Sequence, residues 1–204
     1  MSSTTRTLSI YVWLSVIVAS SVLAVCVAAA ILGRQRADDP TAYFYEVFDV
    51  GHPGIVGALA SIGFMSTAAI SLVLALTLAS RPWMITGALF TVLAADNLLR
   101  LHNQIPAGDV LFRVGYWSVI IWLIPHLSRQ RRPAQGMFML VIGLSLVALS
   151  ELLDLLSRGG NISDVVEESA ACLGAWCLAL AMAGIAASLL SERSGSATDE
   201  RGLR

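Results

Sequence analysis

Six side chains of the types that bind metal ions or carry protons lie within or beside apolar stretches of this sequence. They are five carboxylates and one imidazole: Asp96, His102, Glu151, Asp154, Glu167 and Glu168. Such groups on facing helices form divalent-metal sites, and they also relay protons in membrane transporters. A divalent metal ion is therefore a candidate cofactor, with five candidate ligands: Asp96, His102, Glu151, Glu167 and Glu168.

Structural ion pairs are the alternative interpretation of the same acids. Asp96 precedes Arg100 by four residues, and Asp154 precedes Arg158 by the same spacing. An acid four residues before a base is the favourable order for an ion pair within a helix. This favours a structural role for Asp154 and Arg158. Glu151 has no such partner in its own segment, so ligation and structural pairing both stay open for it.

The composition indicates that membrane-spanning helices must position these side chains. The chain has 204 residues, of which 56% are hydrophobic and 13% charged, with a mean hydropathy of +0.75. Soluble domains carry roughly a quarter charged residues. The deficit suits a surface facing lipid, because a charge at the bilayer centre costs about 2.5–3.5 kcal/mol. Membrane lipid is thus an expected partner, and the net charge of −1 gives no argument for nucleic acid.

Six apolar runs are long enough to cross a bilayer at the helical rise of about 1.5 Å per residue. They cover residues 8–33, 54–80, 83–102, 111–127, 136–157 and 165–190. The first run exceeds the roughly 7–15 residues of a signal-peptide core, so we expect a retained helix. We predict an all-α, polytopic six-helix transmembrane bundle forming one domain over residues 1–190. A polar cytoplasmic tail is predicted at 191–204.

The distribution of arginines predicts the orientation of the bundle. Arg129, Arg131 and Arg132 lie between the fourth and fifth spans, and the positive-inside bias places that loop in the cytoplasm. Both termini are then cytoplasmic, in a bacterial inner (plasma) membrane. With this topology the acids inside the spans all fall toward the outer face. The inner half offers almost no charged residue, which argues against a continuous path for ions.

Small residues at four-residue spacing predict close helix packing in the last span and in the second. The last span carries Ala171, Ala175, Ala179, Ala183 and Ala187, and the second carries the pairs Gly54/Ala58 and Gly57/Ser61. Such faces let helix backbones approach closely in lipid. They favour assembly with other membrane-protein subunits or self-association.

No complete catalytic set is present in the sequence, and no catalytic residue is assigned. There is no G-x-S-x-G, H-E-x-x-H or phosphate-binding loop. The three cysteines, Cys26, Cys172 and Cys177, lie in apolar runs and form no C-x-x-C motif, so we interpret them as packing residues. His52 precedes Pro53 and is interpreted as a loop residue.

Several motifs together resemble a family of uncharacterised bacterial six-helix membrane proteins. They are Phe48-Asp-Val-Gly-His-Pro53, Ala94-Ala-Asp-Asn-Leu-Leu-Arg-Leu-His-Asn103, Ser150-Glu151 and Glu167-Glu-Ser-Ala-Ala-Cys-Leu-Gly174. The pattern of that family is D-E-x4-H-E in the third helix, an isolated Glu in the fifth, and E-E-x-x-E-x-x-G in the sixth. The resemblance covers about residues 44–185. It implies an acid-rich metal or proton site, matched here by Asp96, His102, Glu151, Glu167, Glu168 and Gly174.

Three positions depart from that pattern. Asn97, Asn103 and Ala171 stand where the family has acids. Asparagine keeps an oxygen ligand but lacks the charge that holds a hard cation. We therefore predict a non-catalytic accessory or scaffold subunit of a membrane complex, with a degenerate acidic pocket near the outer face. Two alternatives remain: a carboxylate–His metal-binding membrane enzyme, and a small proton-coupled transporter or sensor.

Overall fold

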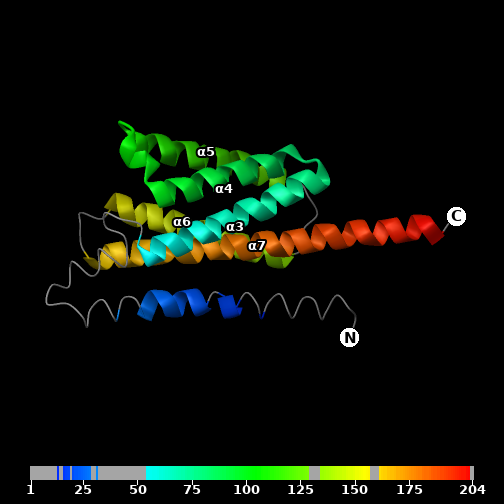
Figure 1. The fold of residues 1–204 in the computed structure, drawn as a ribbon, viewed down its shortest axis with the longest axis horizontal. Coiled ribbons are helices and arrows are strands. Elements are labelled where there is room, and N and C mark those ends of the chain that lie inside the picture. The colour runs from blue at the N-terminus through cyan, green and yellow to red at the C-terminus, as the bar shows by residue number, and fades with distance from the viewer. Residues whose placement is uncertain are drawn as a thin grey trace.

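The computed structural model describes residues 13, 16–18, 20–28, 31, 54–128, 134–156 and 161–202. These residues form helices joined by short turns, with no strand among them, which confirms the all-α prediction. The elements are α3 (Ile55–Leu78), α4 (Arg81–Leu99), the 3-10 helix η1 (Leu101–Gln104), α5 (Gly108–Ser128), α6 (Ala134–Leu156) and α7 (Asn161–Gly202). Figure 1 shows the α-helices lying roughly along one long axis, with the helical segment at 20–28 running beside them.

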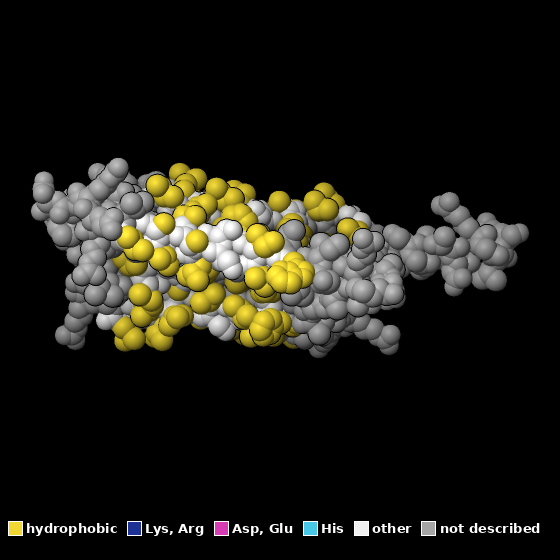
Figure 2. Space-filling model, turned by 90° about the horizontal axis from the view of Figure 1, so that it is seen from below, with side chains coloured by type: hydrophobic (Ala, Val, Ile, Leu, Met, Phe, Trp, Pro, Cys, Tyr) yellow, Lys and Arg dark blue, Asp and Glu magenta, His cyan; other side chains and the backbone are white. Residues whose placement is uncertain are grey.

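Four of the described helices are long and apolar enough to cross a membrane: Ile55–Leu78, Arg81–Leu99, Gly136–Leu156 and Val165–Leu190. Two shorter apolar helices cover Val16–Ala28 and Val110–Pro125. Large apolar side chains point outward, including Leu76, which is 85% exposed. Figure 2 shows these apolar side chains over the described part of one face, without a visible charged one. The chain is therefore a helical membrane protein, while the count of six spans stays a prediction.

The predicted third span ends earlier than its apolar run. Arg100 adopts a left-handed conformation with φ of 49°, and its backbone N–H bonds to the carbonyl of Asp96 at 2.6 Å. A left-handed residue of this kind terminates a helix. His102 consequently lies in η1 rather than in α4. The predicted boundary of 83–102 thus becomes Arg81–Leu99.

Helix α7 packs against both α3 and α6, and α3 packs in turn on α4. The contacts are close because small residues meet there. A Cβ added to Gly63 of α3 would lie 2.9 Å from the Cβ of Ala175. A Cβ added to Gly174 would lie 3.0 Å from the carbonyl oxygen of Gly143 on α6. Of the predicted alanine face, Ala175 and Ala179 are buried, Ala171 and Ala183 are half-buried, and Ala187 is exposed.

Helix α5 is packed more loosely than its neighbours. Its backbone contacts are mainly with α4 and η1. A Cβ added to Gly115, in the middle of α5, would meet no atom within 4 Å. The position of α5 therefore depends on side-chain contacts, among them the buried cluster of Leu89, Ile120 and Leu123.

Two predicted segments differ from, or fall outside, the described structure. Helix α7 continues through the predicted polar tail as far as Gly202. The connection at 34–53, with His52, lies outside the described residues.

The helical segment at 20–28 packs on α7, where Cys26 and Cys172 belong to the same buried cluster. Both are free and buried. Because the two side chains lie in one cluster, we expect copper-phenanthroline to join these cysteines within one chain. Mass spectrometry of unreduced peptides would detect the bond, and Cys177→Ser should leave it intact. If Cys26 formed bonds between chains only, the placement of this segment would be wrong.

Candidate polar site at one end of the bundle

Polar side chains meet where α4 and α6 end and where α5 and α7 begin. Figure 1 shows these four helix termini at the same end of the molecule, which we call the polar end. Consecutive antiparallel helices bring residues far apart in the chain to one level. Acids near the end of one helix and the start of another therefore become neighbours.

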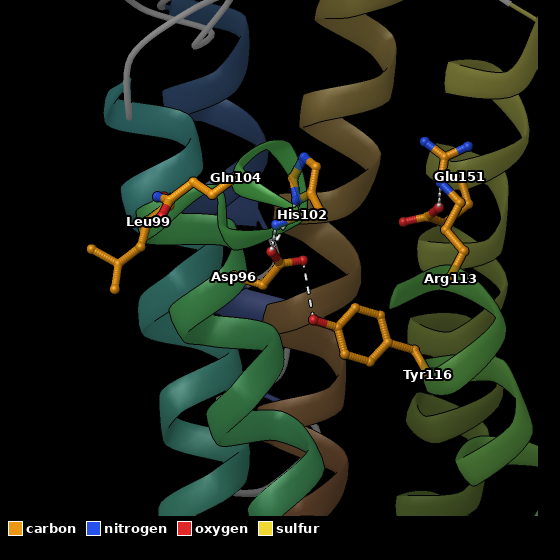
Figure 3. Close-up of polar contacts among 7 residues, drawn as sticks. All are labelled: Asp96, Leu99, His102, Gln104, Arg113, Tyr116 and Glu151. Carbon is orange, nitrogen blue, oxygen red and sulfur yellow. Dashed lines mark hydrogen bonds and ion pairs between the residues drawn. The ribbon is translucent and has the colours of Figure 1, made fainter. Parts of the chain in front are cut away.

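Asp96, in the last turn of α4, is the centre of the first group of contacts at the polar end. It is 7% exposed. Its Oδ1 accepts hydrogen bonds from the backbone N–H of His102 at 2.9 Å and from His102 Nδ1 at 2.9 Å. Its Oδ2 accepts a hydrogen bond from the hydroxyl of Tyr116 at 3.0 Å (Figure 3). A carboxylate can only accept, so the Nδ1 of His102 carries the proton in this pair.

These contacts join three consecutive elements through one carboxylate. Asp96 belongs to α4, His102 to η1 and Tyr116 to α5. Because α4 has ended at Leu99, the Asp96 side chain serves as the acceptor for the turn that follows it. We call Asp96, His102 and Tyr116 the Asp96 cluster.

Arg113 links α5 to α6 in a second group of contacts. Its Nε lies 3.0 Å from Oε2 of Glu151, and its Nη2 pairs with the carboxylate of Asp154. The contact with Glu151 lacks hydrogen-bond alignment and is therefore an ion pair. All three side chains are partly exposed, so each pair stabilises the fold only modestly. The pairs lie on the face of α5 that is turned toward α6.

Asn97 forms a third contact, between α4 and α3. Its Nδ2 donates to the carbonyl of Gly57 and to the hydroxyl of Ser61, both at 2.9 Å. An ionised acid has no proton to donate and could not make either bond. The Asn97 amide therefore joins α4 to α3 through two hydrogen bonds that the acid of the family pattern could not donate.

The structure gives Asp96 and Asp154 partners other than those that the spacing within each helix suggested. Helix α4 ends before Arg100, so Asp96 and Arg100 do not share a helical face, and the Asp96 carboxylate accepts from His102 and Tyr116 instead. Asp154 pairs with Arg113 on another helix. Arg158 lies outside the described residues.

The five predicted metal ligands do not gather at one point in the described part of the chain. Asp96 and His102 are in contact, whereas Glu151 lies beside Arg113 on the α6 side (Figure 3). Glu167 and Glu168 are half-buried at the start of α7 and have interactions of their own. Within the described ranges, no three His, Cys, Asp or Glu side chains are placed to hold a metal ion. The metal site stays a prediction.

Tyr116 is the residue of the polar end that sequence reasoning missed. Its hydroxyl bonds to the buried carboxylate of Asp96. The available signal was its spacing, because Tyr116 follows Arg113 by three residues and so shares a helical face with it. For Arg113, the sequence indicated only that a charged residue lies near the start of the predicted span at 111–127.

The fold and this site define a helical membrane protein in which polar side chains at one end form hydrogen bonds and ion pairs with one another. The model of a domain of unknown function, DUF8692, matches residues 13–185, which is most of the chain and includes the whole polar end. The chain belongs to this family. No curated protein and no solved structure matches this chain.

Proposed function

We propose that this chain is a non-catalytic accessory or scaffold subunit of a bacterial inner-membrane assembly. The observation that carries the proposal is the hydrogen bonding of Asp96, a buried acid of the polar end. Both of its oxygens accept hydrogen bonds from donors of the same chain. A carboxylate held in this way fixes the relative positions of helices, whereas a catalytic or transporting acid needs access to a substrate or to water.

Two further features support a structural role. Asn97 joins α4 to α3 through bonds that an acid could not form. The glycines of α6 and α7 bring their helix backbones into direct contact. Helices held by hydrogen bonds and small-residue contacts form a rigid unit, on which other membrane subunits can assemble.

We infer an orientation with both termini in the cytoplasm and the polar end toward the outside, in a bundle of six spans. The inference rests on the arginines between α5 and α6 and on the positive-inside bias. A reporter fused to the C-terminus that is active only in the cytoplasm tests it. Inactivity of that reporter in a well-expressed fusion would reverse the orientation.

Site-directed photo-crosslinking in native membranes tests the role as a subunit. A photoreactive amino acid would replace an outward residue on each of three helices, namely Leu76 on α3, Val92 on α4 and Ile121 on α5. A stable partner should give one discrete protein adduct, at some of these positions and not at others. The buried Leu74, half a turn from Leu76, is the matched control and should give none.

Two results together would contradict the proposal. If no position yields a protein adduct and the protein migrates as a lone protomer after gentle extraction, it is not a subunit of a stable assembly. The metal-binding alternative would then be examined by elemental analysis of wild type and of Glu151→Ala. The transport alternative would require flux into liposomes that is lost in Asp96→Asn.

A further inference from the structure

An apolar cavity of about 190 Å³ lies in the half of the bundle away from the polar end. All five helices contribute to its wall, which includes Phe90, Ile120, Leu140, Leu144, Leu178 and Met182. On α5 and α6 these residues lie in the halves remote from Arg113 and Glu151. The cavity therefore belongs to the apolar interior of the bundle and not to the site described above.

The wall of the cavity is almost entirely hydrocarbon. Its two hydroxyl groups are bonded within their own helices, Thr67 to the carbonyl of Gly63 at 3.0 Å and Thr86 to that of Pro82 at 2.8 Å. A buried water needs two to four polar partners, which such a wall does not supply. An apolar cavity of roughly 150 Å³ is already large enough to bind benzene. A chemically matched occupant is therefore a hydrocarbon.

The cavity opens sideways between α5 and α6. Ile124 of α5 and Val141 of α6 both line it, yet they are 51% and 58% exposed. Residues that face a cavity and the outer surface at once mark its mouth. The backbones of α5 and α6 are not closely packed, which leaves room for this opening.

The mouth lies within the apolar stretches of both helices, Val110–Pro125 on α5 and Gly136–Leu156 on α6. Ile124 is four residues before the end of α5, and Val141 is seven residues after the start of α6. At about 1.5 Å per residue these positions are roughly 6–10 Å inside the helix ends. A lipid whose polar head stays at that membrane surface could place one chain through the mouth.

We propose that this cavity binds one acyl chain of a membrane phospholipid, which enters between Ile124 and Val141. The chemistry favours this occupant over a quinone, because quinone carbonyls would need hydrogen-bond donors that the wall lacks. A phospholipid keeps its polar groups outside and leaves only methylenes within. Filling the cavity restores the dispersion contacts that an empty space would forfeit.

The experiment measures phospholipid retained by the full-length protein after purification in mild detergent, by native mass spectrometry and lipid extraction. Val141→Trp blocks the mouth at an exposed position, where folding is not threatened. Val73→Trp on α3 is the matched control, since Val73 is 55% exposed and does not line the cavity. We expect Val141→Trp to retain phospholipid about tenfold more weakly than wild type, which corresponds to about 1.4 kcal/mol. Val73→Trp should behave as wild type.

A second variant and a photoreactive lipid make the test decisive. Leu144→Phe fills the cavity from within and should also reduce retention. Phosphatidylethanolamine with a diazirine in one acyl chain should label peptides containing Ile124 and Leu178 in wild type, and much less in both cavity variants. Equal retention and labelling in Val141→Trp would overturn the proposal. Recovery of a quinone or a free fatty acid in place of phospholipid would overturn it as well.

Discussion

Replacement of Asp96 by alanine is expected to lower the free energy of unfolding by about 3 kcal/mol, since each buried donor left without a partner costs roughly 1–3 kcal/mol. Three donors would lose their acceptor: the backbone N–H and Nδ1 of His102, and the hydroxyl of Tyr116. The two ring donors can recover part of the loss by turning toward water. The backbone N–H belongs to the turn that follows α4 and cannot turn away.

Two milder substitutions separate the parts of the Asp96 cluster. Asp96→Asn keeps an acceptor for His102, and its amide can donate to the Tyr116 oxygen, so most of the stability should be retained. Tyr116→Phe removes a single donor and should cost about 1 kcal/mol. Unfolding by SDS titration in mixed micelles measures all three variants. If Asp96→Ala were as stable as wild type, the cluster would have no structural role, and the proposed function would lose its main support.

The second large effect is expected at the contact between α6 and α7. A Cβ on Gly174 would lie 2.8 Å from a methyl group of Val147 and 3.0 Å from the carbonyl oxygen of Gly143. Backbone stands on one side of this contact, so the helices must separate to accept even a methyl group. Gly174→Ala should therefore destabilise the protein by about 1–3 kcal/mol, the usual cost of overpacking.

Gly115→Ala is the matched control, because both glycines lie within helices. No atom stands within 4 Å of a Cβ added to Gly115. Alanine is the better helix former, so this substitution should be neutral or stabilising by up to about 1 kcal/mol. The same SDS titration compares the two variants. If Gly174→Ala and Gly115→Ala changed the free energy of unfolding by the same amount, the contact of α6 with α7 would not be the cause. Helix propensity would then explain both results.

Periodicity and composition were sufficient for the class of protein and for the general location of its polar residues. Apolar runs separated by short polar breaks require consecutive helices that alternate in direction. This alternation alone puts Asp96, at the end of one run, at the same end of the bundle as Glu151 and Glu167. The four-residue spacing of alanines likewise predicted that the last helix would be packed closely. This holds in the middle of the helix, where Ala175 and Ala179 are buried, but not at Ala187, which is exposed.

The sequence did not predict which side chains pair with Asp96 and Asp154. Spacing suggested that Asp96 would pair with Arg100 and Asp154 with Arg158. The first interpretation assumed a helix that continues past Leu99, and the left-handed backbone at Arg100 ends it. The structure gives Asp154 a partner on α5, namely Arg113. Rules for pairs within a helix do not describe contacts between helices, which depend on how the helices are rotated.

The sequence by itself determined that this is an all-α membrane protein with the acids of its apolar segments toward one end, because hydropathy and helical period are properties of each segment alone. Only the tertiary structure decided that Asp96 accepts from His102 and Tyr116, and that Arg113 joins α5 to α6. It also decided that an apolar cavity lies in the other half of the bundle. These features depend on the relative rotation and separation of helices, which result from packing of the whole bundle at small residues such as Gly63, Gly143 and Gly174.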